Sequence, residues 1–188
     1  MAIAWEESEK GNSGTITPKL VPVIASLLDK SIQRNEILGA PKRDVVTVFD
    51  GSKAPTMNVR QYIERIYKYA RCSKSCYVVA YIYIDRFIQA TGLRLTCLNV
   101  HRLLITSLMV ATKFMDDECC NNEYYAKVGG VSTAEMNKLE MEFLFSLDFR
   151  LNVTVELYAK YCRQLEREGV VGQLKSSRLM SSVRFPLG

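Results

Sequence analysis

The chain has 188 residues, of which 48% are hydrophobic and 24% charged, enough for one domain with a substantial core. It contains no apolar run near the roughly 20 residues that cross a bilayer, which excludes a membrane-spanning protein. Its N-terminus lacks the basic start and apolar stretch of a secretory signal, so we expect a reducing compartment and free thiols. The net charge of +5 is mixed with acidic residues, a pattern that does not favour nucleic-acid binding.

In chain order, residues 1–15 are polar and predict a flexible lead-in, followed by a single domain over residues 16–168. Apolar residues then recur at helical spacing and predict a first helix that ends at Gly39; they are Leu20, Ile24, Leu27, Leu28 and Ile32. Residues 39–56 form a connector. Its run "VVTVF" has the composition of a strand, but no partner strand is found elsewhere, so we expect a packed loop.

Five helices are predicted next, over residues 58–70, 73–92, 99–115, 123–128 and 132–147. Asn58 with Gln61 and Ser132 with Glu135 have the spacing of capping boxes, which mark two of the starts. A further helix begins after Thr154 and is expected to end at Gly169, before a polar, disordered tail over residues 169–188. The fold class is therefore all-α, a five-helix bundle around a central apolar helix with flanking N- and C-terminal helices.

The central helix carries one charge that its surroundings do not explain. Residues 103–115 are apolar or small apart from Lys113. In the helix expected over residues 132–147, Glu140 interrupts a stripe of large apolar residues in the same way. Taken singly, Lys113 could pair with Asp116 or Asp117, and Glu140 with Lys138. Taken together, they suggest a lysine and a glutamate that meet at the edge of an exposed apolar patch, which a partner protein would cover.

No catalytic constellation is found in the sequence. It has no glycine-rich phosphate loop, nucleophile elbow or metalloprotease motif, and the single histidine, His101, has no suitably spaced partners. The six cysteines leave zinc as an alternative, since Cys72 and Cys76 have a usable spacing, but two spaced pairs are missing. We therefore expect a protein that is not an enzyme, with no small-molecule substrate, metal or other cofactor.

Three segments, "SCYVVAYIYIDRF", "LLITSLMVATKFMDDE" and "STAEMNKLEMEFLFSLDFRLNV", resemble the second, third and fifth helices of the cyclin box. The resemblance spans about residues 17–168 and is greatest for the plant P-type, or U-type, cyclins. It implies a regulatory subunit that packs box helices 3 and 5 against the αC helix of a cyclin-dependent kinase, A-type by family expectation, and activates it. It also implies an intracellular protein of the nucleus and cytoplasm, with no nucleic-acid or membrane partner.

The resemblance also assigns roles to individual residues. The kinase-binding lysine falls on Lys113 and the glutamate on Glu140, with Glu142 as the rival for the acidic role. The apolar contacts that accompany them fall on Val110, Phe114, Leu144 and Phe149. A structural ion pair is expected between Asp85 and Arg60.

Two features depart from the larger cyclins. The segment "NVRQYIERI" lacks the tryptophan of the substrate-docking patch, and no second cyclin box follows. The alternatives are a nucleic-acid-binding protein built like the cyclin-fold transcription factors, and a scaffold that binds a kinase without activating it.

Overall fold

The computed structural model describes residues 19–39 and 47–182, with side chains as far as residue 171. The predicted lead-in and residues 183–188 lie outside this part of the chain. Within it there are seven helices and no strand, so the all-α prediction is confirmed. The helices are α1 (Leu20–Ile37), α2 (Val59–Tyr69), α3 (Lys74–Thr91), α4 (Val100–Met115), α5 (Asn122–Gly129), α6 (Thr133–Ser146) and α7 (Val155–Ser182).

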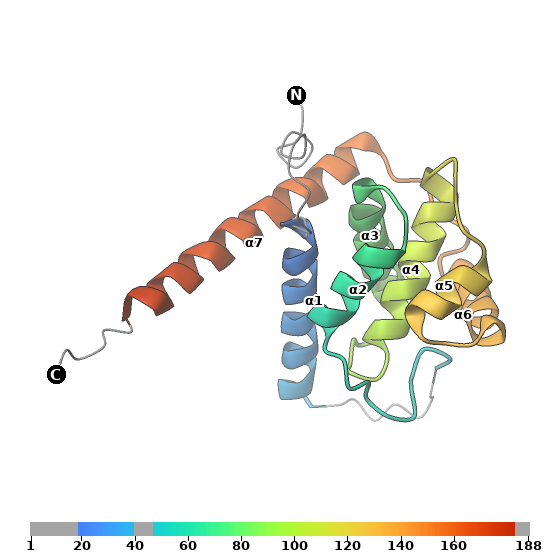
Figure 1. Cartoon of the computed structure of the whole chain (residues 1–188), viewed down its shortest axis with the longest axis horizontal. Coiled ribbons are helices and arrows are strands. Elements are labelled where there is room, and N and C mark those ends of the chain that lie inside the picture. The colour runs from blue at the N-terminus through green and yellow to red at the C-terminus, as the bar shows by residue number, and fades with distance from the viewer. Residues whose placement is uncertain (1–18, 40–46, 183–188) are drawn as a thin grey trace.

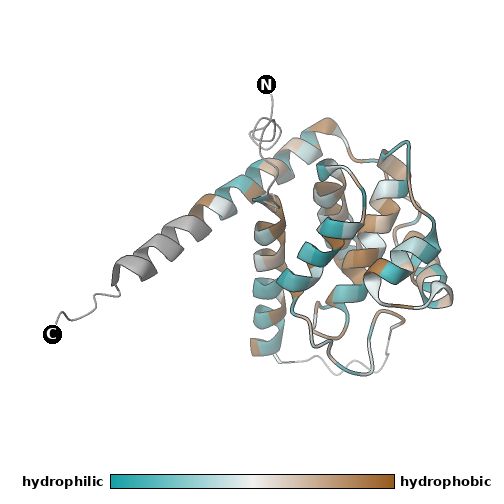
Figure 2. Cartoon of the chain, viewed as in Figure 1, coloured by the Kyte–Doolittle hydropathy of each residue, from teal (hydrophilic) through white to brown (hydrophobic). Residues whose placement is uncertain are grey.

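Helix α4 lies at the centre of the bundle, where it packs against α2, α3, α5 and α6 (Figure 1). From Val100 to Thr112 every residue except Arg102 is buried, as the nearly continuous apolar sequence predicts. Figure 2 shows the contrast with α2, which is largely hydrophilic on the side toward the viewer. Lys113 directly follows Thr112, the last buried residue of α4, so this otherwise enclosed helix carries a charge in its last turn.

Three aromatic rings join the connector to α3 and α6. Phe143 stacks on Phe87 with ring centroids 5.0 Å apart and an interplanar angle of 8°. Phe49 meets Phe87 edge-on at 5.0 Å and Phe143 at 6.3 Å, and it is fully buried. The segment "VVTVF" therefore packs its last residue into the core as a turn, as expected of its described residues 47–49.

The two predicted capping boxes differ in the structure. Asn58 and Gln61 form a complete box at the start of α2. Ser132 accepts a hydrogen bond from the Glu135 amide, but the Glu135 carboxylate pairs with Arg102 of α4 at 2.6 Å. This carboxylate therefore joins the beginnings of α4 and α6 and does not close a box.

Helix α7 does not end at Gly169 but continues to Ser182, so the backbone of residues 169–182 is helical where we expected a disordered tail. The glycine allows a close approach between helices: a Cβ at Gly169 would lie 3.2 Å from Cγ2 of Val23 in α1. One residue earlier, Glu168 pairs with Lys30 of α1 at 2.8 Å. Beyond this contact, α7 extends away from the bundle (Figure 1).

His101 has a structural role. Its Nε2 donates to the Met57 carbonyl at 2.8 Å and its ring meets Tyr62 edge-on at 4.6 Å. The other ring nitrogen, Nδ1, is buried without a hydrogen-bond partner. Burial lowers the pKa of His101 below its usual value, since the charged imidazolium is poorly solvated there.

This burial predicts an acid-sensitive fold. Because the pKa of His101 is lower in the folded than in the unfolded chain, the unfolded chain binds the proton first as the pH falls below about 6.5. The free energy of unfolding should therefore fall as the pH is lowered from 7 to 5. This fall should be steeper than in His101→Gln by up to about 1.4 kcal/mol per pH unit. Urea titrations of both proteins across this range test the prediction, and equal slopes would contradict it.

Candidate functional site

The two charges singled out in the sequence form an ion pair. Lys113, in the last turn of α4, lies with its Nζ 2.6 Å from Oε1 of Glu140 in α6. The lysine side chain is 32% exposed and the glutamate 16%, so both still reach the surface. Asp116, one of the alternative partners for Lys113, accepts hydrogen bonds from the backbone amide and hydroxyl of Ser73. The juxtaposition expected from the sequence is therefore confirmed.

Asn122, the first residue of α5, completes a three-helix polar network that sequence reasoning missed. Its Nδ2 donates to Oε2 of Glu140 at 2.6 Å and to Oδ1 of Asn137 at 2.7 Å, and its own Oδ1 accepts from Lys113. These bonds use two of the three N–H donors of Lys113 and leave lone pairs on both oxygens of Glu140. The Lys113–Glu140 pair is thus held in place, and both side chains can still form hydrogen bonds with a partner.

The structure also separates the two candidate carboxylates. Glu142 is exposed, and no ion pair connects it to Lys113 within the described chain. Two residues along a helix correspond to a rotation of about 200°, so Glu142 projects from a different face of α6. Glu140 is therefore the better candidate for a charged contact beside Lys113.

Large apolar side chains lie exposed on α4, α6 and the connector that follows α6. We define the exposed apolar surface as four residues: Phe114 (51% exposed), Met141 (50%), Phe145 (64%) and Phe149 (54%). The rings of Phe145 and Phe149 meet edge-on at 5.3 Å. Such a group of exposed rings is characteristic of a surface that another protein covers.

The predicted apolar contacts are only partly exposed. Phe114 and Phe149 belong to this surface, and Leu144 is half-buried behind it. Val110 is 2% exposed and lies in the core of the bundle, so it can support the surface but not contact a partner. Met141 and Phe145 were missed, although their spacing of four residues places them on one face of α6.

A cleft of about 870 Å³ opens between α3, the end of α4 and the α6–α7 connector. Phe114 and Phe149 line it together with Leu147, and Arg86 and Ala90 of α3 close the other side. The cleft adjoins the exposed apolar surface through its two phenylalanines. It has the size and lining to accept an apolar side chain from a partner helix.

The expected ion pair between Asp85 and Arg60 is not formed. Oδ2 of Asp85 accepts hydrogen bonds from the Tyr161 hydroxyl of α7 and from Gln89. Arg60 pairs with Glu64, one turn further along α2, at 3.0 Å. Helices α3 and α7 pack against each other, and the hydrogen bond between Tyr161 and Asp85 links them.

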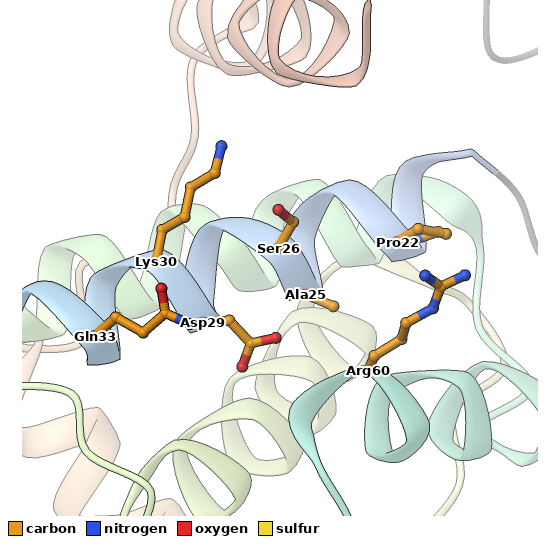
Figure 3. Close-up of a pocket in the computed structure, with 7 residues that line it drawn as sticks. All are labelled: Pro22, Ala25, Ser26, Asp29, Lys30, Gln33 and Arg60. Atoms are coloured by element: carbon orange, nitrogen blue, oxygen red, sulfur yellow. The ribbon is translucent and has the colours of Figure 1, made fainter. Parts of the chain in front are cut away.

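Arg60 instead lines a second cleft of about 340 Å³ between α1 and α2, shown in Figure 3. Asp29 points between the two helices, and burial raises its pKa. The two cations of this cleft are already paired, Lys30 with Glu168 and Arg60 with Glu64. The cleft is open and its lining has mixed charge, so we assign no function to it.

Within residues 19–39 and 47–182, no group of three or more histidine, cysteine, aspartate or glutamate side chains is arranged to hold a metal ion. None of the helices in these ranges is both long and apolar enough to cross a membrane.

Comparison with known proteins agrees with this arrangement of helices. The family model described as Cyclin matches residues 19–151. The chain is 48% identical to Cyclin-P3-1 of Oryza sativa subsp. japonica over 173 residues, which cover 91% of this chain and 72% of that protein. It is 48% identical to Cyclin-U4-2 of Arabidopsis thaliana over 167 residues (87% and 77%), and 47% identical to Cyclin-U4-1 of the same plant over 173 residues (90% and 86%).

Proposed function

The chain belongs to the cyclin family, and we propose that it binds and activates a cyclin-dependent kinase of the A type. Membership of the family supports a regulatory role and a cyclin-dependent kinase as partner in general. The observation that carries the specific proposal is the Lys113–Glu140 pair, held beside an exposed apolar surface. An exposed apolar surface is unfavourable where only water contacts it, and an ordered ion pair at its edge suits a surface that a protein covers.

The proposed mechanism is a change of kinase conformation. In a kinase of this type without its cyclin, the αC helix is rotated outward and the Lys–Glu pair that positions the ATP phosphates is broken. Packing of the exposed apolar surface against αC would turn that helix inward and favour the active arrangement of the activation loop. Activation is then a population shift, whose size equals the difference in binding free energy between the two kinase conformations.

Affinity and register would come from different side chains. Burial of Phe114, Phe145 and Phe149 removes apolar area from water and supplies most of the free energy of binding. The remaining donor of Lys113 and the lone pairs of Glu140 bond kinase backbone groups and fix the orientation of αC. An apolar residue of αC enters the cleft between Phe114 and Phe149.

Co-expression with an A-type cyclin-dependent kinase tests the proposal. We expect the wild-type chain to co-purify with the kinase and to raise its phosphorylation of a histone substrate, and a Lys113→Ala/Glu140→Ala variant to do neither. Co-purification without activation would identify a scaffold. Failure of the wild-type chain to bind any cyclin-dependent kinase would overturn the proposal. Salt-sensitive binding of random duplex DNA in a mobility-shift assay would favour the transcription-factor alternative.

We also propose that the complex resides in the nucleus and the cytoplasm, as the family suggests. Microscopy of a fluorescent fusion expressed at its natural level would check this location. Exclusion of the fusion from both compartments would contradict it.

A further inference from the structure

Helix α3 holds the connector between α6 and α7 through three consecutive carbonyl groups. The Tyr83 hydroxyl donates to the Leu151 carbonyl at 2.6 Å. Arg86, three residues further along α3, donates from Nη1 to the Arg150 carbonyl and from Nη2 to the Asn152 carbonyl, both at 2.9 Å. One guanidinium group therefore spans the carbonyl that Tyr83 binds.

The backbone immediately before these carbonyls has an unfavourable conformation. Asp148 and Phe149 have φ angles of 51° and 54°, in the left-handed region that residues with a side chain seldom adopt. Such residues persist only where surrounding contacts enforce the conformation. The Asp148–Arg150 ion pair is a weak constraint, because both side chains are about four-fifths exposed.

The remaining contacts are the edge-on contact of Phe149 with Phe145 and the hydrogen bonds to the backbone. The Phe149 amide donates to the Leu144 carbonyl and the Arg150 amide to the Leu147 carbonyl, both at 3.0 Å, which ties the turn to the end of α6. On the far side of the turn, Arg86 and Tyr83 are the described side chains that tie the connector to α3 by hydrogen bonds, while Leu151 packs against the core. Without them the connector could relax, and the exposed Phe149 would move with it.

We infer that Arg86 is a positioning residue, which presents Phe149 in its binding conformation before a kinase arrives. The inference rests on the proposed function, since it assumes that Phe149 contacts the kinase. Its physical basis is preorganisation: a side chain that is already ordered loses less conformational freedom on binding. Arg86 itself lies at the wall of the cleft opposite Phe149 and acts through the connector.

Lysine cannot replace this arginine. The planar guanidinium presents two parallel N–H donors, which match carbonyl groups two residues apart, whereas a lysine ammonium is a point charge. Arg86 also lies over the ring of Tyr83, 6.0 Å from its centroid, and this contact holds the guanidinium plane in place. Arg86→Lys should therefore retain the charge and lose most of the positioning.

A double-mutant cycle tests the inference. We expect Arg86→Ala to weaken kinase binding about tenfold and Arg86→Lys about fivefold, as expected for loss of preorganisation. In a Phe149→Ala background, Arg86→Ala should cause no further loss, because Arg86 acts through the absent ring. Arg60→Ala, which removes an arginine paired with Glu64 on α2, is the matched control and should leave the dissociation constant unchanged.

The outcomes separate this inference from the proposed function. Suppose that Phe149→Ala weakens kinase binding. If Arg86→Ala then has no effect, or if Arg86→Ala weakens binding equally with and without the Phe149 ring, the positioning role is wrong while the binding surface stands. If Phe149→Ala leaves binding unchanged, the surface itself is wrong.

A second measurement does not involve the kinase. 4-Fluorophenylalanine at position 149 should give a narrow range of 19F chemical shifts in the wild-type chain and averaged, solvent-like shifts in Arg86→Ala, with melting temperatures within a few degrees. An unchanged 19F spectrum in Arg86→Ala would overturn the inference.

Discussion

We expect Glu140→Ala to weaken kinase binding at least thirtyfold while leaving the fold intact. Truncating one member of a hydrogen-bonded charge pair at an interface costs about 2–5 kcal/mol, much of it from the partner charge that remains buried and unpaired. Here the unpaired group would be Lys113, which would keep its hydrogen bond to Asn122 but would be covered by the kinase without its carboxylate partner. Isothermal titration calorimetry with the purified kinase measures the loss.

Three companion variants sharpen this prediction. Glu142→Ala removes an exposed carboxylate two residues away and should change binding less than twofold, since surface charges of this kind contribute little. Lys113→Ala should match Glu140→Ala, and the double variant should fall well short of the sum, because the two side chains act as one network. A Glu140→Ala protein that binds with wild-type affinity, or Glu142→Ala with the larger loss, would remove Glu140 from the interface.

The second large effect is expected at Phe149, where binding and stability should change in opposite directions. Phe149→Gly deletes an exposed ring and should weaken kinase binding by about 2–4 kcal/mol, as for an aromatic residue at the centre of an interface. The same change should raise the free energy of unfolding by about 1 kcal/mol, because glycine adopts a φ of 54° without steric cost. Urea denaturation and calorimetric binding of the same preparation test both halves.

Asp148→Gly is the matched control for this prediction. Asp148 has nearly the same φ, 51°, and an exposed side chain, so its replacement by glycine should stabilise the fold to a similar extent and leave binding nearly unchanged. Loss of stability in Phe149→Gly would mean that the ring contributes to the fold of the free protein. In that case Phe149 would be a structural residue and the interface assignment would need another anchor.

The helices themselves were predictable because local signals and burial agree. In α4 the nearly unbroken apolar sequence predicts burial on all sides, and only Arg102 departs from it before Lys113. The end of α7 was not predictable, since a glycine in a helical pattern reads as a stop signal whether or not a neighbouring helix needs the space. At Gly169 the neighbour is Val23 of α1, 146 positions earlier in the chain.

The candidate site was predictable in part. Helical periodicity placed Lys113 and Glu140 each on an apolar face, and the two charges taken together suggested that these faces meet; the resemblance to cyclins then assigned them to the kinase contact. The contribution of Asn122 has no sequence signal, because its three partners lie on α4 and α6. A resemblance in sequence likewise cannot tell which apolar residues of a helix lie against a neighbour, so it grouped the buried Val110 with the exposed Phe114.

By itself the sequence determined the helix content, the central position of α4 and the presence of charges that a core would not tolerate, because these follow from side-chain period and the cost of burying charge. Only the tertiary structure decided the partners: Asp85 with Tyr161 in place of Arg60, Glu140 with Lys113 and Asn122, and Arg86 with the carbonyls that frame the turn at Phe149. The physical reason is that a pattern along one helix specifies which face is buried. It carries no information about which distant segment will lie against that face.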